Sequence, residues 1–391
     1  MTVIGMTGDE AVAYAVKQSK TDVVAAYQIT PQTIMVERFS KYVADGEVKT
    51  EYVCVESEHS AMSACVGASL TGVRVFTATS SQGLALMHEM LYIASGLRCP
   101  IVMGVANRAL SAPINIHGDQ SDMMGSRDSG WVQIYAENAQ EAYDWTLQAF
   151  KIAEDTDVQL PVAVNLDGFI ITHCMEGVDT LADDAVDKFL LTRQALFKVD
   201  PDKPITIGAL CFTDYYYEFK RQQVEAMRNV RRALDTVCRD YKTAAGRSYG
   251  VLETFGMEDA EAALICLGST AGTAREVARK LRAQGKKVGV VKLWLYRPFP
   301  TEEVLAALKS VKAVAVLDKA VSFGAPYGAL CSDVVSALYT VKGGPKVFNV
   351  VFGLGGRDIQ PTDIEMVFNQ ALETAKTGVV KEETVFLGVR E

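Results

Sequence analysis

The stretch Tyr52-Val53-Cys54-Val55-Glu56-Ser57-Glu58-His59-Ser60-Ala61 joins two different sequence patterns. Tyr52–Val55 is apolar, which predicts a buried strand, and Ser60–Gly72 is rich in small residues, which predicts a helix. Glu58 therefore lies where a helix begins at the top of a strand. A buried carboxylate there is costly unless a partner pairs with it. The alternative is that Glu56 or Glu58 is solvated, or favours the positive end of the helix.

The same alternation of apolar runs and helical patterns continues outward along the chain. Strands are predicted at Asp22–Ile29, Glu51–Val55, Val73–Ala78, Pro100–Ala106, Val132–Ala136 and Pro161–Leu166. Helices are predicted at Ser60–Gly72, Gln82–Ala94 and Gln140–Asp155, and a further helix is expected to have Thr30 as its cap and Pro31 at its first position. Strands this apolar, separated by helices, predict a parallel sheet that is covered on both faces.

The middle of the chain, from about residue 173 to 247, loses this rhythm. Glu218–Thr243 predicts a long, largely exposed helix that leads out of the first domain. The three tyrosines before it, Tyr215, Tyr216 and Tyr217, either form a stacking platform for a ligand or pack the helix onto a neighbouring surface, and we favour packing. After residue 251 a second alternating pattern begins, with strands expected at Ala262–Leu267, Lys287–Trp294, Ala313–Leu317 and Val347–Phe352. We therefore expect domains at 1–250 and 251–391.

Composition excludes several classes of protein. A net charge of −9 over 391 residues argues against nucleic acid as a partner. The N-terminus, Met1–Gly5, does not read as a secretion signal, and the most apolar stretch, Leu84–Ala106, contains charged residues and a proline, so no membrane partner is expected. The eight cysteines lack the spacing of zinc or iron–sulfur ligands, which predicts no metal in this chain and a reducing, cytoplasmic setting.

Three predicted strand ends carry polar groups that could do chemistry: Thr30, Glu58 and Arg108. In doubly wound sheets, ligands gather beyond the carboxyl ends of the strands, and a planar guanidinium such as that of Arg108 suits a carboxylate. The alternatives are that Thr30 is only a helix cap and that Arg108 forms an internal ion pair, with Asp119, Asp122 or Asp128 as its partner. No dinucleotide, P-loop or serine-hydrolase motif is present. Spacing alone thus predicts an α/β enzyme that binds a small acid.

A resemblance makes this more specific. Eight stretches resemble, in a fixed order, the α subunit of pyruvate:ferredoxin oxidoreductase and of related 2-oxoacid:ferredoxin oxidoreductases. They are Tyr27–Pro31 (YQITP), Val55–Ala61 (VESEHSA), Thr77–Met90 (TATSSQGLALMHEM), Asn107–Asp122 (NRALSAPINIHGDQSD), Arg127–Trp131 (RDSGW), Tyr135–Asn138 (YAEN), Tyr296–Phe299 (YRPF) and Gly353–Asp358 (GLGGRD). One departure is Gln28, where the family usually has proline.

The resemblance implies an α/β fold with a pyrimidine-binding-type parallel sheet domain of a thiamine diphosphate enzyme, followed by a transketolase C-terminal-like α/β domain. It also implies residue roles. Glu58 matches the glutamate that hydrogen-bonds the aminopyrimidine ring of the cofactor, and Ile29 is expected to contact the cofactor as well. Arg108 matches the arginine that grips the substrate carboxylate, and Thr30 matches the threonine that hydrogen-bonds the substrate.

The implied activity is oxidative decarboxylation of pyruvate with coenzyme A to acetyl-CoA and CO₂, with electrons passing to ferredoxin. Another 2-oxoacid, such as 2-oxoisovalerate or 2-oxoglutarate, remains an alternative, as does a non-catalytic assembly subunit. No Gly-Asp-Gly motif is present. The resemblance therefore implies that a β subunit holds the diphosphate and Mg²⁺, that β and δ subunits hold the iron–sulfur clusters, and that a γ subunit assists coenzyme A. This chain would be active only with those partners.

Overall fold

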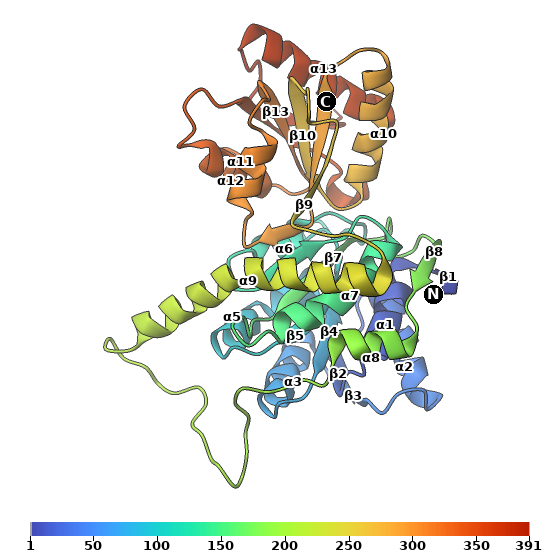
Figure 1. The fold of residues 1–391 in the computed structure, drawn as a ribbon, viewed down its shortest axis with the longest axis vertical. Helices are drawn as coiled ribbons and strands as arrows, with labels where there is room; N and C mark the ends of the chain where they lie inside the picture. The colour runs from blue at the N-terminus through green and yellow to red at the C-terminus, as the bar shows by residue number, and fades with distance from the viewer. Residues whose placement is uncertain (1, 391) are drawn as a thin grey trace.

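The computed structural model describes residues 2–390, which form two α/β units stacked end to end (Figure 1). The first unit is built on a seven-stranded sheet with the order β12-β6-β7-β5-β4-β2-β3. All neighbouring pairs are parallel except β12 with β6. The strands are β2 (Val23–Ala26), β3 (Glu51–Cys54), β4 (Val75–Thr79), β5 (Ile101–Asn107), β6 (Val132–Tyr135), β7 (Val162–Asp167) and β12 (Leu295–Arg297).

Helices cover both faces of this sheet, as predicted. On one face α1 (Gly8–Gln18), α2 (Thr33–Ala44) and α7 (Ala139–Ala153) pack against Val24, Val102 and their neighbours. On the other, α3 (Glu58–Leu70) and α5 (His88–Gly96) pack against Ala25, Met103 and theirs. The remaining elements of this unit are the antiparallel pair β1 (Thr2–Met6) and β8 (Glu176–Thr180), with α4 (Ser81–Leu86), α6 (Ser121–Gly125) and α8 (Asp183–Leu190).

The order of the strands creates a switch point between β2 and β4. From β2 the chain runs to β3 at the edge of the sheet, returns to β4 on the other side of β2, and continues from there to β5. The connections after β2 and β4 therefore leave in opposite directions. In open α/β sheets such a divergence leaves a crevice at the carboxyl ends of the strands, where ligands bind. The segments that follow β2, β3, β4 and β5 all begin at this edge.

The second unit has a six-stranded sheet with the order β15-β14-β13-β10-β11-β9, in which only β9 is antiparallel to its neighbour. β12, which lies between two segments of this unit in sequence, pairs with β6 of the first sheet. The elements are β9 (Leu252–Phe255), β10 (Ala262–Leu267), α10 (Thr270–Ala283), β11 (Val288–Leu293), α11 (Thr301–Ala307), β13 (Ala313–Asp318), α12 (Ala329–Leu338), β14 (Lys346–Val351), η1 (Leu354–Gly356), α13 (Pro361–Thr377) and β15 (Thr384–Phe386).

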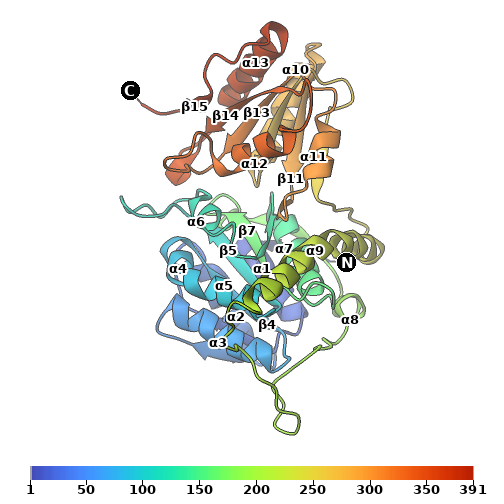
Figure 2. The same ribbon diagram turned by 90° about the vertical axis from the view of Figure 1, so that its left-hand side faces the viewer.

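The long helix α9 (Tyr216–Ala245) covers the predicted range 218–243 and lies across the first unit (Figure 1). Its second half buries Val230, Leu234 and Tyr241. Its first turn projects outward, and the segment 191–215 before it loops away from the body of the unit (Figure 2). The three tyrosines are 58–77% exposed, so the prediction that they pack the helix is wrong within this chain.

Three local predictions were wrong for identifiable reasons. α2 begins at Thr33, after a turn, so Thr30 is not its cap and Pro31 is not its first residue. β3 is not a buried strand, because it forms the edge of the sheet and is mostly exposed. The helix predicted over 82–94 is divided at Met87 into α4 and α5. Among residues 2–390, no helix is both long and apolar enough to cross a membrane.

Asp144 of α7 anchors α9 and the linker after it. Its buried carboxylate accepts hydrogen bonds from the Tyr241 hydroxyl (2.5 Å), the Tyr249 hydroxyl (2.6 Å) and Arg247 Nε (2.6 Å) and Nη2 (2.8 Å). Tyr241 belongs to α9, whereas Arg247 and Tyr249 belong to the segment that leads to β9. One carboxylate therefore fixes the path of the chain between the two units.

We expect Asp144→Ala to destabilise the first unit by about 3–5 kcal/mol, because two hydroxyls lose their acceptor and the Arg247 guanidinium keeps only Asp179. In thermal unfolding this corresponds to a fall in the midpoint on the order of 10 °C. The matched control is Asp240→Ala, which removes a surface ion pair between α9 and Lys151 of α7 (2.7 Å). Such exposed pairs contribute about 0–1 kcal/mol. Equal effects of the two substitutions would contradict the role assigned to Asp144.

Candidate active site

Glu58 is a buried carboxylate at the start of α3, only 6% exposed. Ser57 caps the helix, since its Oγ accepts a hydrogen bond from the Ser60 backbone N–H (3.2 Å). Within residues 2–390, no other side chain donates a hydrogen bond to the Glu58 carboxylate and no cation pairs with it. Burial raises its pKa above the usual value. Glu56, by contrast, is exposed and bonded by the Ser60 hydroxyl, so the solvated alternative describes Glu56 and not Glu58.

The surroundings of Glu58 come from the end of β4 and the start of α4. Gly83 lies directly against the carboxylate, and a methyl group added there would overlap both Glu58 Oε1 and Thr79 Oγ1. The hydroxyls of Thr79 and Ser80 are buried and have no hydrogen-bond partner among the described residues. A group of buried polar atoms that lack partners is unusual in a folded protein. These atoms would suit a polar, nitrogen-bearing ligand that enters beside Glu58.

Arg108 and Thr30 are in direct contact. The chain turns out of β5 at Asn107, and the buried Arg108 donates from Nη1 to the Thr30 carbonyl (2.9 Å) and from Nε to the Asn115 carbonyl (2.9 Å). Burial lowers the pKa of Arg108, and the nearby Asp122 opposes this shift. Among the described residues no carboxylate lies within ion-pair distance of the guanidinium, so the internal ion pair considered above is wrong. Nη2 makes no hydrogen bond to the described residues.

Asp122 is a residue whose importance the sequence did not reveal. Its buried carboxylate accepts hydrogen bonds from Arg108 N (2.9 Å), Ser81 N (3.0 Å), Met123 N (2.7 Å) and Asn107 Nδ2 (2.9 Å). Burial raises its pKa to about 6, although each of these hydrogen bonds acts to lower it. Asp122 had been considered only as an ion-pair partner of Arg108. It binds the backbone of that residue instead, a contact that residue type and spacing do not predict.

The predicted residues thus form two groups at one edge of the sheet. Thr30 and Arg108 touch, and the half-buried Ile29 precedes them, its N–H donating to Gln32 Oε1 (3.2 Å). Glu58 lies beside α4, and no described contact joins it directly to Thr30 or Arg108. The connection runs through α4, which places Gly83 against Glu58 and offers the Ser81 N–H to Asp122. Both groups flank the end of β4, at the switch point.

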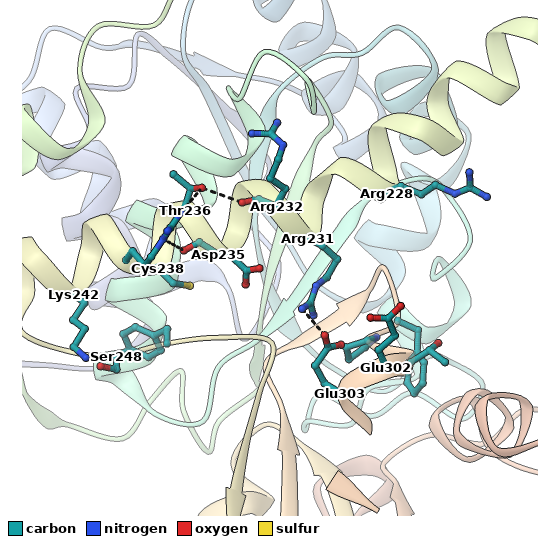
Figure 3. A pocket seen from close by; sticks show the side chains of 15 residues that line it. Arg228, Arg231, Arg232, Asp235, Thr236, Cys238, Lys242, Ser248, Glu302 and Glu303 are labelled. Atoms are coloured by element: carbon teal, nitrogen blue, oxygen red, sulfur yellow. Dashed lines mark hydrogen bonds and ion pairs between the residues drawn. The ribbon is translucent and has the colours of Figure 1, made fainter. Parts of the chain in front are cut away.

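A wide groove lies elsewhere, away from these residues. It has a volume of about 1250 Å³ and runs between α9 and the start of α11, where Arg231 pairs with Glu303 (2.6 Å) (Figure 3). Several basic side chains of α9 line it, but Arg228 and Arg232 also have acidic neighbours within ion-pair distance. None of Thr30, Glu58 and Arg108 contributes to this groove. Volume alone therefore does not identify the candidate site.

Comparison with known families decides the assignment. Residues 14–238 match the family model described as "Pyruvate flavodoxin/ferredoxin oxidoreductase, thiamine diP-bdg", and residues 260–364 match "Pyruvate:ferredoxin oxidoreductase core domain II". The chain belongs to the pyruvate:ferredoxin oxidoreductase family. The first match contains the whole switch-point edge with Thr30, Glu58 and Arg108, so these residues lie in the thiamine diphosphate-binding domain of the family.

Individual relatives agree with the family assignment. Pyruvate synthase subunit PorA of Thermotoga maritima is 51% identical over 389 residues, covering 99% of this chain and 98% of that protein. Ketoisovalerate oxidoreductase subunit VorA of Pyrococcus abyssi is 43% identical, covering 97% and 95%. The solved structure of 2-oxoglutarate:ferredoxin oxidoreductase from Magnetococcus marinus superposes with a TM-score of 0.74 at 23% identity, covering 95% of this chain and 65% of that one. The predicted fold class and the 2-oxoacid:ferredoxin oxidoreductase assignment are confirmed.

We expect Gly83→Ala to displace the Glu58 carboxylate and to lower both cofactor affinity and turnover of the assembled oxidoreductase, turnover by about tenfold or more. Overpacking of this kind typically costs about 1–3 kcal/mol of stability. Gly67→Ala is the control, since Gly67 lies in α3 with open space around it. It should leave turnover unchanged. Thiamine diphosphate titration and steady-state turnover of both variants would reveal the difference, and normal cofactor affinity in Gly83→Ala would contradict the packing described.

Proposed function

We propose that this chain is the subunit of a 2-oxoacid:ferredoxin oxidoreductase that binds the aminopyrimidine of thiamine diphosphate and the substrate carboxylate. The proposed reaction is oxidative decarboxylation of pyruvate with coenzyme A to acetyl-CoA and CO₂, the two electrons passing to ferredoxin. The observation that carries the proposal is the buried, unpaired carboxylate of Glu58 at the switch point of the domain that matches the thiamine family.

Glu58 fits the cofactor because its surroundings need a polar partner. Bound thiamine diphosphate supplies an electron sink for breaking the bond between a carbonyl carbon and a carboxylate. A protonated or shared carboxyl of Glu58 would hold a proton at the aminopyrimidine ring nitrogen, which suits a group whose pKa burial has raised. The buried hydroxyls of Thr79 and Ser80, which have no partner among the described residues, support further hydrogen bonds to the cofactor. We assign Ile29 to a contact with the ring.

Arg108 and Thr30 fit the substrate. The guanidinium of Arg108 has no internal carboxylate among the described residues, and two backbone carbonyls orient it. In a largely buried position such a cation attracts an anion more strongly than it would in water. Thr30 is exposed, and its backbone carbonyl accepts the hydrogen bond from Arg108, which supports a role for its hydroxyl at the same ligand. We assign Arg108 to the carboxylate of the 2-oxoacid and Thr30 to a hydrogen bond with the substrate.

Partner subunits are needed to complete this site. Among residues 2–390 no cluster of histidine, cysteine, aspartate or glutamate could hold a metal ion, and no Gly-Asp-Gly motif occurs. From the family resemblance we propose that a β subunit supplies the diphosphate and Mg²⁺ site, that β and δ subunits carry iron–sulfur clusters, and that a γ subunit assists coenzyme A. The exposed apolar side chains along 191–219, among them Leu196, Phe212 and Phe219, support burial against other chains.

The remaining parts of the proposal concern the layout and setting of the chain. We propose that residues 1–250 form the pyrimidine-binding domain and 251–391 the transketolase C-terminal-like domain. The eight cysteines are all unpaired thiols, which supports a reducing, cytoplasmic location. Two alternatives to pyruvate chemistry differ in kind. One is the same reaction on 2-oxoisovalerate or 2-oxoglutarate, and the other is a non-catalytic assembly subunit.

The deciding experiment is reduction of ferredoxin, or of a viologen dye, by the complex purified with its natural partners. Coenzyme A, thiamine diphosphate and Mg²⁺ would be supplied, with pyruvate, 2-oxoisovalerate and 2-oxoglutarate compared at equal concentration. We expect the highest kcat/KM for pyruvate. A higher kcat/KM for another 2-oxoacid would support the same reaction but would show that pyruvate is not the preferred substrate. Absence of turnover with all three acids would contradict the enzymatic role.

We expect Glu58→Gln to lower turnover by about 10²-fold or more, the range found for lost proton transfer, while the complex assembles and unfolds as the wild type does. The amide keeps the shape of the side chain but removes the titrating proton. Glu56→Gln is the matched control, since Glu56 lies two residues away, is exposed and bonds only Ser60. It should show normal turnover. Near-normal turnover in Glu58→Gln would exclude the proposed proton-holding role.

A further inference from the structure

The Gly353–Gly356 turn of the second unit contacts the loop that carries Arg108. This turn follows β14, and the backbone N–H and carbonyl of Gly355 each make a hydrogen bond to the loop. The Gly355 carbonyl accepts from Asn115 Nδ2 (2.9 Å), and the Gly355 N–H donates to Asp119 Oδ2 (3.1 Å). Both partners lie between β5 and α6, in the segment that begins with Arg108. The turn belongs to the GLGGRD stretch, and its position is therefore tied to this loop of the first unit.

The contact is too close for side chains on the turn. Gly355 has a φ of +59°, a left-handed conformation that L side chains rarely adopt, and a methyl group there would overlap Asn115 Nδ2. At Gly356 a methyl group would overlap the Cβ of His117. Two adjacent glycines thus let the backbone of one unit approach the loop of the other. Because such a packed contact tolerates little displacement, a shift of the turn would also shift the loop that carries Arg108.

Asn115 links the turn to Arg108 through hydrogen bonds. While its side-chain amide holds Gly355, its backbone carbonyl accepts the hydrogen bond from Arg108 Nε (2.9 Å). Its Oδ1 also accepts from the His117 N–H (2.7 Å), which fixes the loop around it. Arg108 has a separate anchor for its backbone, the carboxylate of Asp122. The backbone is therefore held by the first unit alone. The guanidinium is oriented by two carbonyls, that of Thr30 in the first unit and that of Asn115, whose side chain is held by Gly355 of the second unit.

The rest of this loop offers the guanidinium little support. Residues 111–114 are exposed, with Ile114 78% accessible. Without the tie to Gly355, Asn115 would be held mainly by the short Asn115–His117 hydrogen bond and by the hydrogen bond from Ala109 N to the His117 carbonyl (3.1 Å). If the Asn115 carbonyl could move, the Arg108 Nε that donates to it would no longer be held in one direction. Binding a substrate carboxylate would then have to order the side chain as well.

We propose that Asn115 and Gly355 are positioning residues for substrate binding: the Gly353–Gly356 turn, acting through Asn115, sets the orientation of the Arg108 guanidinium and thereby the affinity for the carboxylate of the 2-oxoacid. This inference rests on the proposed substrate role of Arg108. It assigns the second unit a part in substrate recognition, although none of its residues contacts Arg108 directly in the hydrogen bonds described.

The test uses the assembled complex and measures KM and kcat for pyruvate in Asn115→Ala, Gly355→Ala, the double variant and Arg108→Ala. We expect Asn115→Ala and Gly355→Ala each to raise KM about five- to tenfold with kcat within about twofold, as for loss of binding that is uniform through the reaction. The double variant should resemble Asn115→Ala, because the methyl added at Gly355 then no longer meets the Asn115 amide, and coupled sites are not additive. Gly343→Ala is the control for backbone strain, since its φ of +70° is similar and no atom lies near. It should keep the wild-type KM.

The series separates the inference from the proposal beneath it. If Arg108→Ala raises KM while Asn115→Ala and Gly355→Ala leave it unchanged, the positioning role is wrong and the clamp stands. If Arg108→Ala itself leaves KM unchanged, the clamp is wrong and this inference falls with it. A fall in kcat at normal KM in Asn115→Ala would also overturn the inference. Should Gly355→Ala fail to assemble, Asn115→Ala decides alone, because it only truncates a loop side chain.

Discussion

The candidate site depends on one constraint: a buried carboxylate at the end of a parallel sheet must be neutralised or hydrogen-bonded. Asp122 meets it with four N–H donors, which come from the start of α4, from Asn107 and Arg108 at the end of β5, and from α6. In doing so it ties Ser81 and Arg108 to one point. The loops that follow two neighbouring strands are therefore fixed relative to each other. Without such a tie the loops at a switch point would be free to separate, because no sheet hydrogen bonds hold them.

Glu58 is subject to the same constraint, but the described chain does not satisfy it. It is buried as Asp122 is, yet no side chain of the described chain satisfies it, and two buried hydroxyls nearby are also unsatisfied. Both carboxylates meet α4, Asp122 at Ser81 and Glu58 at Gly83, and only Asp122 is hydrogen-bonded by its neighbours. The first makes the edge rigid, and the second keeps its bonding capacity for a ligand. A rigid surround makes an unsatisfied group useful, because a ligand then binds without having to reorganise the protein.

Much of this could be predicted from sequence, and the failures have physical causes. Long apolar strands such as Ile101–Asn107 and the periodic helix α7 were evident because local pattern and tertiary position agree. The short strands β1, β9, β12 and β15 were missed, since each exists only through pairing with a distant strand. Glu58, Thr30 and Arg108 could be proposed as site residues from their type and place in the sequence, whereas the contacts of Asp122 and Asn115 involve backbone groups. Residue identity does not show which backbone group a side chain will meet, so such roles need coordinates.

The division of labour between the two units follows from the same geometry. The second unit meets the first at the loop after β5 through backbone contacts, Gly355 with Asn115 and Asp119, and the Gln120 N–H with the Lys319 carbonyl (2.8 Å). A substitution does not remove a backbone N–H or carbonyl. The close approach of the turn to the loop also requires glycine at positions 355 and 356, because a side chain there would overlap the loop. A site built in this way is sensitive to how the units are seated.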